Sequence, residues 1–158
     1  NQLTNMNVYT SNYCGVTTDV KESKTFSNYT LVDLPGIYSL TPYSNEETIT
    51  KDYLLNEKVD LIVNVIDINN IRRNLFLTFE LLDLNIPMIL VVNMMDEFKG
   101  KLDLELLIKT IGIDCIPISA KRNEGLNQLK NCILHNKNFT QSYNGFENSS
   151  IVDNFSSP

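Results

Sequence analysis

The sequence predicts an α/β fold built on a mostly parallel β-sheet. Two short, β-branched and nearly continuous apolar runs, residues 60–67 and 87–93, have the pattern of strands that are covered on both faces. Residues 71–84 lie between them and are apolar over a length that favours a buried helix. A strand, a helix and a second strand in this order form a βαβ unit, in which the two strands are parallel.

The remaining segments are predicted to continue this alternation. Further strands are expected at residues 29–33 and 115–119, and further helices at residues 46–55, 103–111 and 125–134. Residues 136–158 become rich in Asn and Ser and lose all periodicity, so we expect a linker or a disordered tail there.

The helix ends have their own signals. Asn69 or Asn70 is expected to cap the helix at residues 71–84, because Asn side chains accept hydrogen bonds from the first free amides of a helix. Asn85 is expected to end the same helix, and Gly112 to close the next one in a left-handed conformation.

Composition limits the classes of function. The 158 residues carry 13 Lys and Arg against 19 Asp and Glu, a net charge of −6, which argues against a phosphate-neutralising nucleic-acid surface. The three cysteines are odd in number and far apart, so we expect neither a disulfide framework nor a zinc site, and a reducing compartment fits best.

The longest apolar run, residues 86–92, is far shorter than the ~20 residues of a membrane-spanning helix. The first residues do not resemble a signal peptide, and the chain as given is expected to be soluble.

Three polar motifs directly follow predicted strands. They are D-x-x-G at residues 33–36, N-x-x-D at residues 93–96 and S-A-K at residues 119–121. Ligands of open α/β sheets bind at the carboxyl ends of the strands, so we expect the three motifs to converge on one edge of one sheet. Each motif alone also occurs in ordinary turns and helix caps, but their order and spacing together favour a guanine-nucleotide site.

The side chains of these motifs fit the chemistry of such a site. The Asp33 carboxylate can reach Mg²⁺ through water, and the Gly36 amide can approach a terminal phosphate because no side chain intervenes. The Asp96 carboxylate can accept hydrogen bonds from the ring N–H and the amine of guanine, a pair of donors that adenine lacks. Asn93 can tie neighbouring loops together. A backbone amide of S-A-K can donate to the guanine carbonyl oxygen, while the Lys121 stem packs on the base.

With these motifs, residues 1–135 resemble the GTPase (G) domain of the ferrous iron transport protein B (FeoB) family, a group of Era-like P-loop GTPases. The matching stretches are N-Y-C-G-V-T at 12–17, L-V-D-L-P-G-I-Y-S-L at 31–40, D-Y-L-L at 52–55, R-N-L-F-L-T at 73–78 and N-M-M-D at 93–96. Other Era-like GTPases share D-x-P-G and N-x-x-D, but they do not usually share P-G-x-Y-S-L or R-N-L-x-L-T.

The resemblance implies a Ras-like P-loop NTPase fold, a three-layer sandwich, and it implies the site residues. Thr17 would be the switch threonine that contacts Mg²⁺, and Asp33 would be the second residue at the metal. Asn93 and Asp96 would select guanine, and Ser119 and Ala120 would complete the base pocket. The nucleotide-binding residues implied in full are Gly15, Val16, Thr17, Thr18, Asp33, Leu34, Pro35, Gly36, Asn93, Met94, Met95, Asp96, Ser119, Ala120 and Lys121.

The resemblance also implies cofactors and a process. The cofactors would be GTP or GDP, Mg²⁺ and potassium, the last held partly by backbone carbonyls between Ser11 and Tyr13. Ile37 stands where many GTPases have a water-orienting Gln, so hydrolysis would be slow. In the intact protein the domain would regulate iron(II) uptake at the cytoplasmic face of the inner membrane, with the helical and transmembrane parts of the transporter as partners and no nucleic acid.

One motif of the family is missing from the sequence. No G-x-x-x-x-G-K-[ST] phosphate loop is present, so the chain is expected to begin just after that loop and to lack the first strand. We then expect very weak GTP affinity and no useful hydrolysis from the chain as given, and a vacant slot between the strands that end at Asp33 and Asp67. Two alternatives stay open: a truncated remnant without nucleotide activity, and an Era-like GTPase that serves ribosomes or RNA, against which the acidic balance argues.

Overall fold

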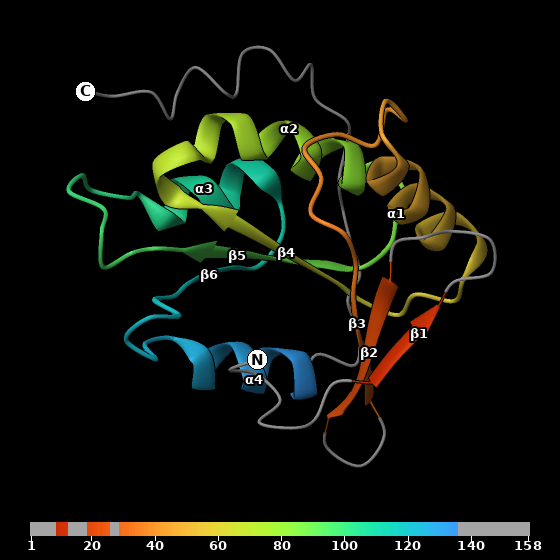
Figure 1. The fold of residues 1–158 in the computed structure, drawn as a ribbon. Coiled ribbons are helices and arrows are strands. Elements are labelled where there is room, and N and C mark those ends of the chain that lie inside the picture. Colours follow the sequence, from red (N-terminus) through yellow and green to blue (C-terminus); the bar gives the residue numbers. More distant parts are fainter. Residues whose placement is uncertain (1–8, 13–18, 26–28, 136–158) are drawn as a thin grey trace. The chain divides into compact units, whose positions relative to one another are not determined.

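The computed structural model describes residues 9–12, 19–25 and 29–135 (Figure 1). The chain divides into two compact units, Asn1–Lys58 and Val59–Pro158, and each has its own three-stranded sheet. The expected linker or tail at residues 136–158 lies outside the described residues. Within the described part, no helix is both long enough and apolar enough to cross a membrane.

The sheet of the first unit is antiparallel. Strands β1 (Tyr9–Asn12), β2 (Asp19–Thr25) and β3 (Tyr29–Asp33) lie in the order β1-β2-β3, with Lys21 opposite Asp33. Strand β3 is where the sequence predicts a strand, but its partner β2 is antiparallel, and neither β1 nor β2 was expected. The D-L-P-G motif begins at the last residue of β3.

Helix α1 (Asn45–Asn56) follows this motif and holds part of it in place. Its first turn is closed by a capping box, in which Ser44 Oγ accepts from the Glu47 amide at 3.3 Å and Glu47 Oε2 accepts from the Ser44 amide at 2.9 Å. One turn further on, the buried Thr50 donates through Oγ1 to the Pro35 carbonyl at 3.4 Å. The helix therefore holds the D-L-P-G motif through the backbone carbonyl of Pro35.

The sheet of the second unit is parallel and confirms the predicted βαβ unit. Strands β4 (Ile62–Asp67), β5 (Met88–Asn93) and β6 (Cys115–Pro117) lie in the order β4-β5-β6. The register places Asp67 opposite Asn93, so that the polar ends of β4 and β5 lie at the same edge. Strand β5 is central and its first five residues are buried, which explains its unbroken apolar run.

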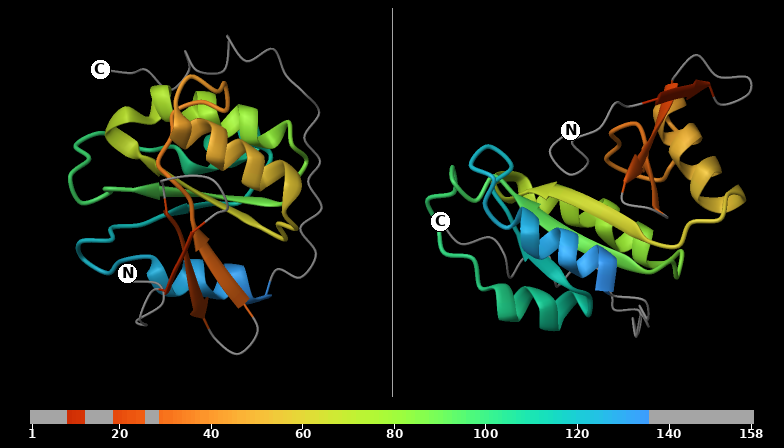
Figure 2. Two further views of the ribbon diagram at one scale, coloured as in Figure 1. Left: turned by 45° about the vertical axis from the view of Figure 1, so that its right-hand side comes forward. Right: turned by 90° about the horizontal axis from the view of Figure 1, so that it is seen from below.

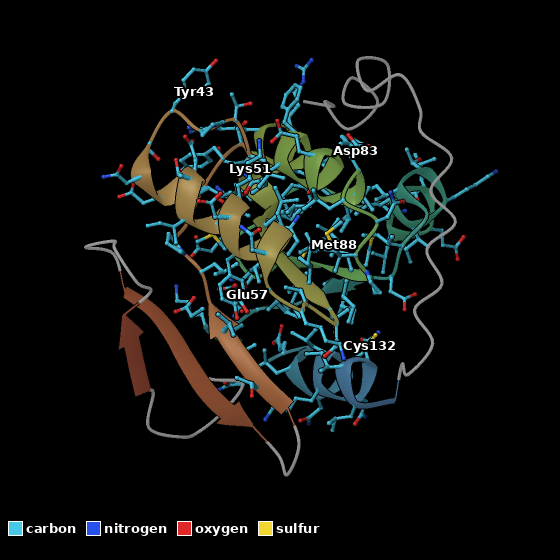
Figure 3. All side chains as sticks on the ribbon, turned by 90° about the vertical axis from the view of Figure 1, so that its right-hand side faces the viewer. Tyr43, Lys51, Glu57, Asp83, Met88 and Cys132 are labelled. Atoms are coloured by element: carbon cyan, nitrogen blue, oxygen red, sulfur yellow. The ribbon has the colours of Figure 1, made fainter. Side chains whose placement is uncertain are left out.

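Helices cover both faces of this parallel sheet. Helices α2 (Ile71–Leu82) and α3 (Leu104–Ile111) lie on one face, and α4 (Leu126–His135) lies on the other (Figures 1 and 2). Met88 lies inside the core that they form with the sheet (Figure 3). The largest side chains with almost no exposure in this core are Phe79, Leu75, Leu82, Ile89, Leu90, Leu107, Ile111 and Leu129.

The turn between β4 and α2 is organised by Asp67 and not by an Asn cap. Asp67 Oδ1 accepts from the Asn69 amide at 2.9 Å, and Oδ2 accepts from Asn70 Nδ2 at 2.7 Å. Asn70 is the N-cap residue of α2, as predicted, but its side chain makes no capping bond. Burial opposes ionisation of Asp67, yet the hydrogen bonds from Asn70 and Asn69 leave its pKa lower than usual. The carboxylate accepts several donors at once, which a single Asn oxygen cannot do as well.

The helix ends agree in part with the sequence. Gly112 closes α3 with φ 78° and donates its amide to the Ile108 carbonyl at 2.8 Å, as predicted. Helix α2 ends at Leu82, two residues earlier than expected, and Asn85 follows it with φ 54°.

A buried polar pair joins β4 to α2 and offers a test of the packing. Asn64 Nδ2 donates to Thr78 Oγ1 at 2.9 Å, and that hydroxyl donates to the Asn74 carbonyl at 3.2 Å. Replacing Thr78→Val leaves the buried Asn64 amide without its acceptor, so we expect the free energy of unfolding to fall by about 1–3 kcal/mol in urea titrations. The double variant Asn64→Leu with Thr78→Val removes both polar groups and is expected to recover most of this loss. If the double variant lost as much free energy of unfolding as Asn64→Leu and Thr78→Val lose together as single variants, this account would be contradicted.

Candidate functional site

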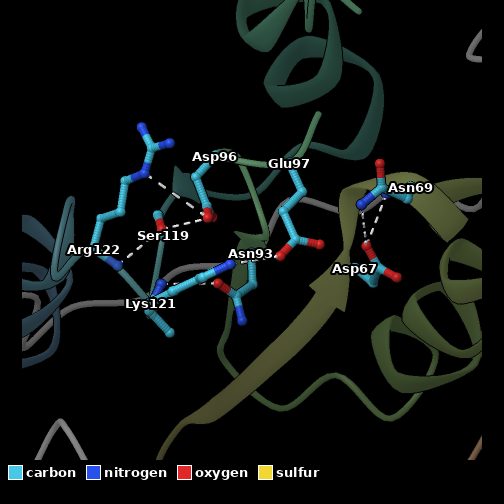
Figure 4. Close-up of polar contacts among 9 residues, drawn as sticks. Asp67, Asn69, Asn93, Asp96, Glu97, Ser119, Lys121 and Arg122 are labelled. Atoms are coloured by element: carbon cyan, nitrogen blue, oxygen red, sulfur yellow. Dashed lines mark hydrogen bonds and ion pairs between the residues drawn. The ribbon is translucent and has the colours of Figure 1, made fainter. Parts of the chain in front are cut away.

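Two loops meet at the carboxyl edge of the parallel sheet. The first, here called the β5 loop, comprises residues 93–97, and the second, the β6 loop, comprises residues 118–125. The Met95 amide donates to the Ile118 carbonyl at 3.2 Å, so the loops are joined through their backbones. Figure 4 shows the polar side chains of both loops gathered against one another. The motifs N-x-x-D and S-A-K therefore lie together, as their strand-end positions predict.

The β6 loop is a tight turn with a closed base. Ser119 and Glu124 exchange two backbone hydrogen bonds of 3.1 Å each, which brings the chain back on itself. Asn123 has φ 58° and Gly125 has φ 75°, left-handed conformations that reverse the chain. A Cβ atom at Gly125 would lie 2.4 Å from the Pro117 carbonyl oxygen, so only glycine fits there without a shift of the backbone.

Four of the predicted site residues make direct contacts across the two loops. Asn93 Oδ1 accepts from the Ala120 amide at 3.1 Å, so Asn93 ties the loops together. Ser119 Oγ donates to Asp96 Oδ1 at 2.6 Å. The same Ser119 oxygen accepts from the Arg122 amide at 3.1 Å, and Ser119 is fully buried. The bonds of Asn93 and Asp96 fix side chains of the β5 loop against the β6 loop, and the bond between Arg122 and Ser119 holds the β6 loop itself.

Asp96 is the electrostatic centre of this arrangement. Its side chain is 5% exposed, and its Oδ2 atom lies 3.9 Å from Arg122 Nε. The hydrogen bond from Ser119 lowers the pKa of Asp96 and burial opposes this. A hydrogen bond from the Asp96 amide and the positive charges of Arg122 and Lys121 add to the lowering. Asp96 is therefore a nearly buried carboxylate that stays ionised below its ordinary pH range, and among the described residues only Ser119 donates to it from a side chain.

Lys121 pairs with the opposite loop, and the expected packing of its stem on a base stays a prediction. Its Nζ atom lies 3.3 Å from Glu97 Oε1, and both side chains are exposed, so the ammonium group is held by the β5 loop. The Ala120 amide already donates to Asn93. The Lys121 amide has no acceptor among the described residues, so it is the better donor for a carbonyl group of a base. The site thus exposes an N–H donor near an acceptor carboxylate.

The methionines of N-M-M-D shape the backbone of the β5 loop. Met94 has φ 66°, and its carbonyl accepts from the Glu97 amide at 3.0 Å, which makes a tight turn. Its side chain is 36% exposed. A residue with a side chain as large as that of Met is strained in this left-handed conformation. The backbone bond from the next residue, Met95, to Ile118 of the β6 loop helps to hold the turn.

The D-L-P-G motif belongs to the first unit and is open. Asp33 and Gly36 are exposed, and Leu34 and Pro35 are partly buried. A Cβ atom added at Gly36 would meet no atom within 4 Å, and its φ is not positive, so the described residues give no reason for glycine there. The approach of this motif to the two loops stays a prediction, because each unit is described by itself. The predicted residues Gly15, Val16, Thr17 and Thr18 lie outside the described residues, and so does the predicted metal contact of Thr17.

Comparison with known proteins decides the family. A family model described as "Ferrous iron transport protein B" matches residues 1–133, which is most of the chain. The chain belongs to the ferrous iron transport protein B (FeoB) family. Its D-L-P-G, N-M-M-D and S-A-K motifs are therefore those of a FeoB N-terminal GTPase domain.

Curated FeoB relatives are similar over most of this chain. The Fe(2+) transporter FeoB of Helicobacter pylori is 41% identical over 130 residues, which cover 78% of this chain and 20% of that protein. The transporter of the same name from Escherichia coli K12 is 40% identical over 140 residues, which cover 82% of this chain and 18% of that protein. The chain thus spans about a fifth of the length of these relatives. They give no support to the alternative of a ribosome- or RNA-associated GTPase.

Solved FeoB structures share the fold. The cytosolic domain of the T. maritima FeoB iron transporter in its GMPPNP form superposes with a TM-score of 0.82 at 36% identity, covering 94% of this chain and 62% of that one. The cytosolic domain of L. pneumophila FeoB superposes with a TM-score of 0.78 at 36% identity, covering 85% of this chain and 60% of that one. The predicted α/β fold class is confirmed.

Sequence reasoning missed two charged residues that join the two loops. Glu97 and Arg122 follow directly on the N-x-x-D and S-A-K motifs, and each pairs with a charge on the opposite loop. The sequence does contain a signal for them: two adjacent acidic residues at 96–97 in one loop and two adjacent basic residues at 121–122 in the other. Once the two loops are placed side by side, these opposite charges face each other. Among the described residues no cluster of three His, Cys, Asp or Glu side chains could hold a metal ion.

Proposed function

We propose that residues 1–135 are the guanine-nucleotide-binding G domain of a ferrous iron transporter. In the intact protein the domain hydrolyses GTP slowly and regulates iron(II) uptake at the cytoplasmic face of the membrane, with the helical and membrane parts of the transporter as its partners. The observation that carries the proposal is the nearly buried, ionised Asp96 held by Ser119. Family membership supports it, as do the solved relatives named for their GDP and GMPPNP forms.

The geometry of the two loops fits a guanine base. Guanine presents two adjacent donors, its ring N–H and its amine, next to a carbonyl acceptor. Among the described residues only Ser119 donates to the Asp96 carboxylate from a side chain, and each carboxylate oxygen has two lone pairs, so the carboxylate can accept both donors. The Lys121 amide then donates to the carbonyl. Adenine would leave the carboxylate unpaired, and a buried unpaired charge is costly.

The first unit supplies the residues for the phosphates. Asp33 is exposed at the end of β3, and Gly36 is exposed with no atom within 4 Å of the position a Cβ would take, which leaves room for an approaching phosphate. Asp33 would hold Mg²⁺ through water, together with Thr17, and the metal supplies positive charge to the phosphate oxygens. Backbone carbonyls between Ser11 and Tyr13 would hold potassium. Ile37 cannot orient water, which accounts for slow hydrolysis.

Base selectivity tests the proposal most directly. Titration of the ¹⁵N-labelled chain with GMP is expected to shift the amide signals of Ser119, Ala120 and Lys121, and AMP is expected to bind at least about a hundredfold more weakly. Since the pKa of Asp96 lies below its ordinary value, the carboxylate stays charged as the pH falls from 7 to 5, and the GMP shifts should persist at pH 5. Equal shifts with GMP and AMP, or none with either, would refute the assignment of the base site.

A further inference from the structure

The charged groups around Asp96 point to an internal competitor for the base. We propose that Arg122 competes with guanine for Oδ2 of Asp96, and that it thereby weakens guanine binding in this protein. This inference rests on the proposed function, because it concerns the same carboxylate. It adds a residue that sets the affinity of the site.

The two oxygens of Asp96 have different neighbours. Oδ1 receives the short bond from Ser119 Oγ at 2.6 Å, whereas Oδ2 lies 3.9 Å from Arg122 Nε (Figure 4). A distance of 3.9 Å is too long for a hydrogen bond but within the range of an ion pair. Oδ2 is therefore the oxygen that no described side chain hydrogen-bonds, and the guanidinium group of Arg122 already lies beside it.

The backbone of the β6 loop keeps Arg122 in this position. The Arg122 amide donates to Ser119 Oγ at 3.1 Å, and the two bonds between Ser119 and Glu124 close the turn around it. The guanidinium end is free to move, because the side chain of Arg122 is 59% exposed while that of Asp96 is 5% exposed. The Arg122 side chain can therefore leave for water when a base arrives, whereas Asp96 stays where it is.

The competition has a definite electrostatic sign. Guanine would approach Asp96 with the positive ends of two N–H dipoles, and a guanidinium charge beside Oδ2 makes the potential there less negative. Either Arg122 leaves, which breaks an ion pair, or it stays and reduces the attraction. An ion pair with one exposed partner is worth little, so we expect the affinity to fall by a factor of about three to five because of Arg122.

Neutral guanosine is the probe that isolates this effect, since it has no phosphate to interact with the positive charges. The dissociation constant is measured by ¹⁵N NMR titration of the 158-residue chain and of three variants. Arg122→Gln is expected to bind guanosine about three to five times more tightly than the wild type. Arg122→Lys keeps the competing charge and is expected to lie near the wild type. Lys99→Gln removes the same charge from an exposed side chain outside both loops and is expected to change nothing.

One further readout separates competition from a structural role. The Arg122 Nε–H signal should move when guanosine is added to the wild type, because the base displaces the guanidinium group from Oδ2. If the wild type prefers guanosine to adenosine but Arg122→Gln binds no more tightly, the competition is refuted and the proposed function stands. If neither protein binds guanosine, both are refuted.

Discussion

Replacing Asp96 with Asn is expected to change the base preference of the site from guanine to xanthine. The Asn side chain offers one acceptor and one donor where the carboxylate offers two acceptors. Ser119 Oγ can still donate to the remaining oxygen, as it does to Oδ1 of Asp96 at 2.6 Å, which leaves the amide NH₂ in the place of Oδ2. Xanthine carries a carbonyl where guanine carries its amine, so it can accept from that NH₂ while its ring N–H donates to the oxygen.

The expected effect on guanine is large because the amine would face another donor. We expect Asp96→Asn to lower the affinity for GMP by at least about a hundredfold and to raise that for xanthosine monophosphate above it, measured by competition titrations. Glu97→Gln is the matched control: it makes the same carboxylate-to-amide change at the next residue, whose contact is with Lys121, and should keep the guanine preference. An Asp96→Asn variant that folds and still prefers GMP would show that Asp96 does not read the base.

Replacing Gly125 with Ala is expected to have the largest effect on stability. The new Cβ atom would lie 2.4 Å from the Pro117 carbonyl oxygen and 2.9 Å from Ile118 Cγ2, and Gly125 has φ 75°. Neither neighbour can yield cheaply, because one is the backbone of β6 and the other is a buried side chain. We expect the free energy of unfolding to fall by about 2–4 kcal/mol in urea denaturation.

The chain contains its own control for this change. A Cβ atom at Gly36 would meet nothing within 4 Å and φ there is not positive, so Gly36→Ala should change the stability by less than about 0.5 kcal/mol. Gly125→Ala should also broaden the amide signals of the β6 loop, since it displaces the turn that Ser119 and Glu124 close. Equal stabilities of the two variants would mean that the β6 loop adapts to a side chain at 125.

The sequence predicts those parts of the fold that are carried by apolar patterns. Strands β4 and β5 and helix α2 are clear because burial on several sides demands continuous or periodic apolar residues. Strand β2 was missed because D-V-K-E-S-K-T contains one strongly apolar residue, Val20, and the strand is defined by backbone pairing with β3. Pairing between backbones leaves no mark on side-chain composition.

The candidate site was predictable in its motifs and not in its contacts. Asn93, Asp96 and Ser119 were found because they directly follow strands, where parallel sheets place their ligands. Arg122 was missed because its approach to Asp96 depends on the turn in which its amide donates to Ser119 Oγ, and the spacing of the sequence does not show that turn. The cap at Asp67 was missed for a similar reason, since Asp and Asn rank equally as helix caps and only the geometry of the turn separates them.

The burial of β5 has a consequence for the lifetime of the base site. Residues 89–92 have no solvent exposure, and Asn93 follows them directly. Amide protons in such a strand exchange with deuterium only when the whole unit opens, whereas frayed ends and loops exchange through small fluctuations. The end that carries Asn93 is thus attached to the most slowly exchanging part of the second unit. Loosening elsewhere in the chain should therefore leave the recognition of a purine ring intact until that unit unfolds completely.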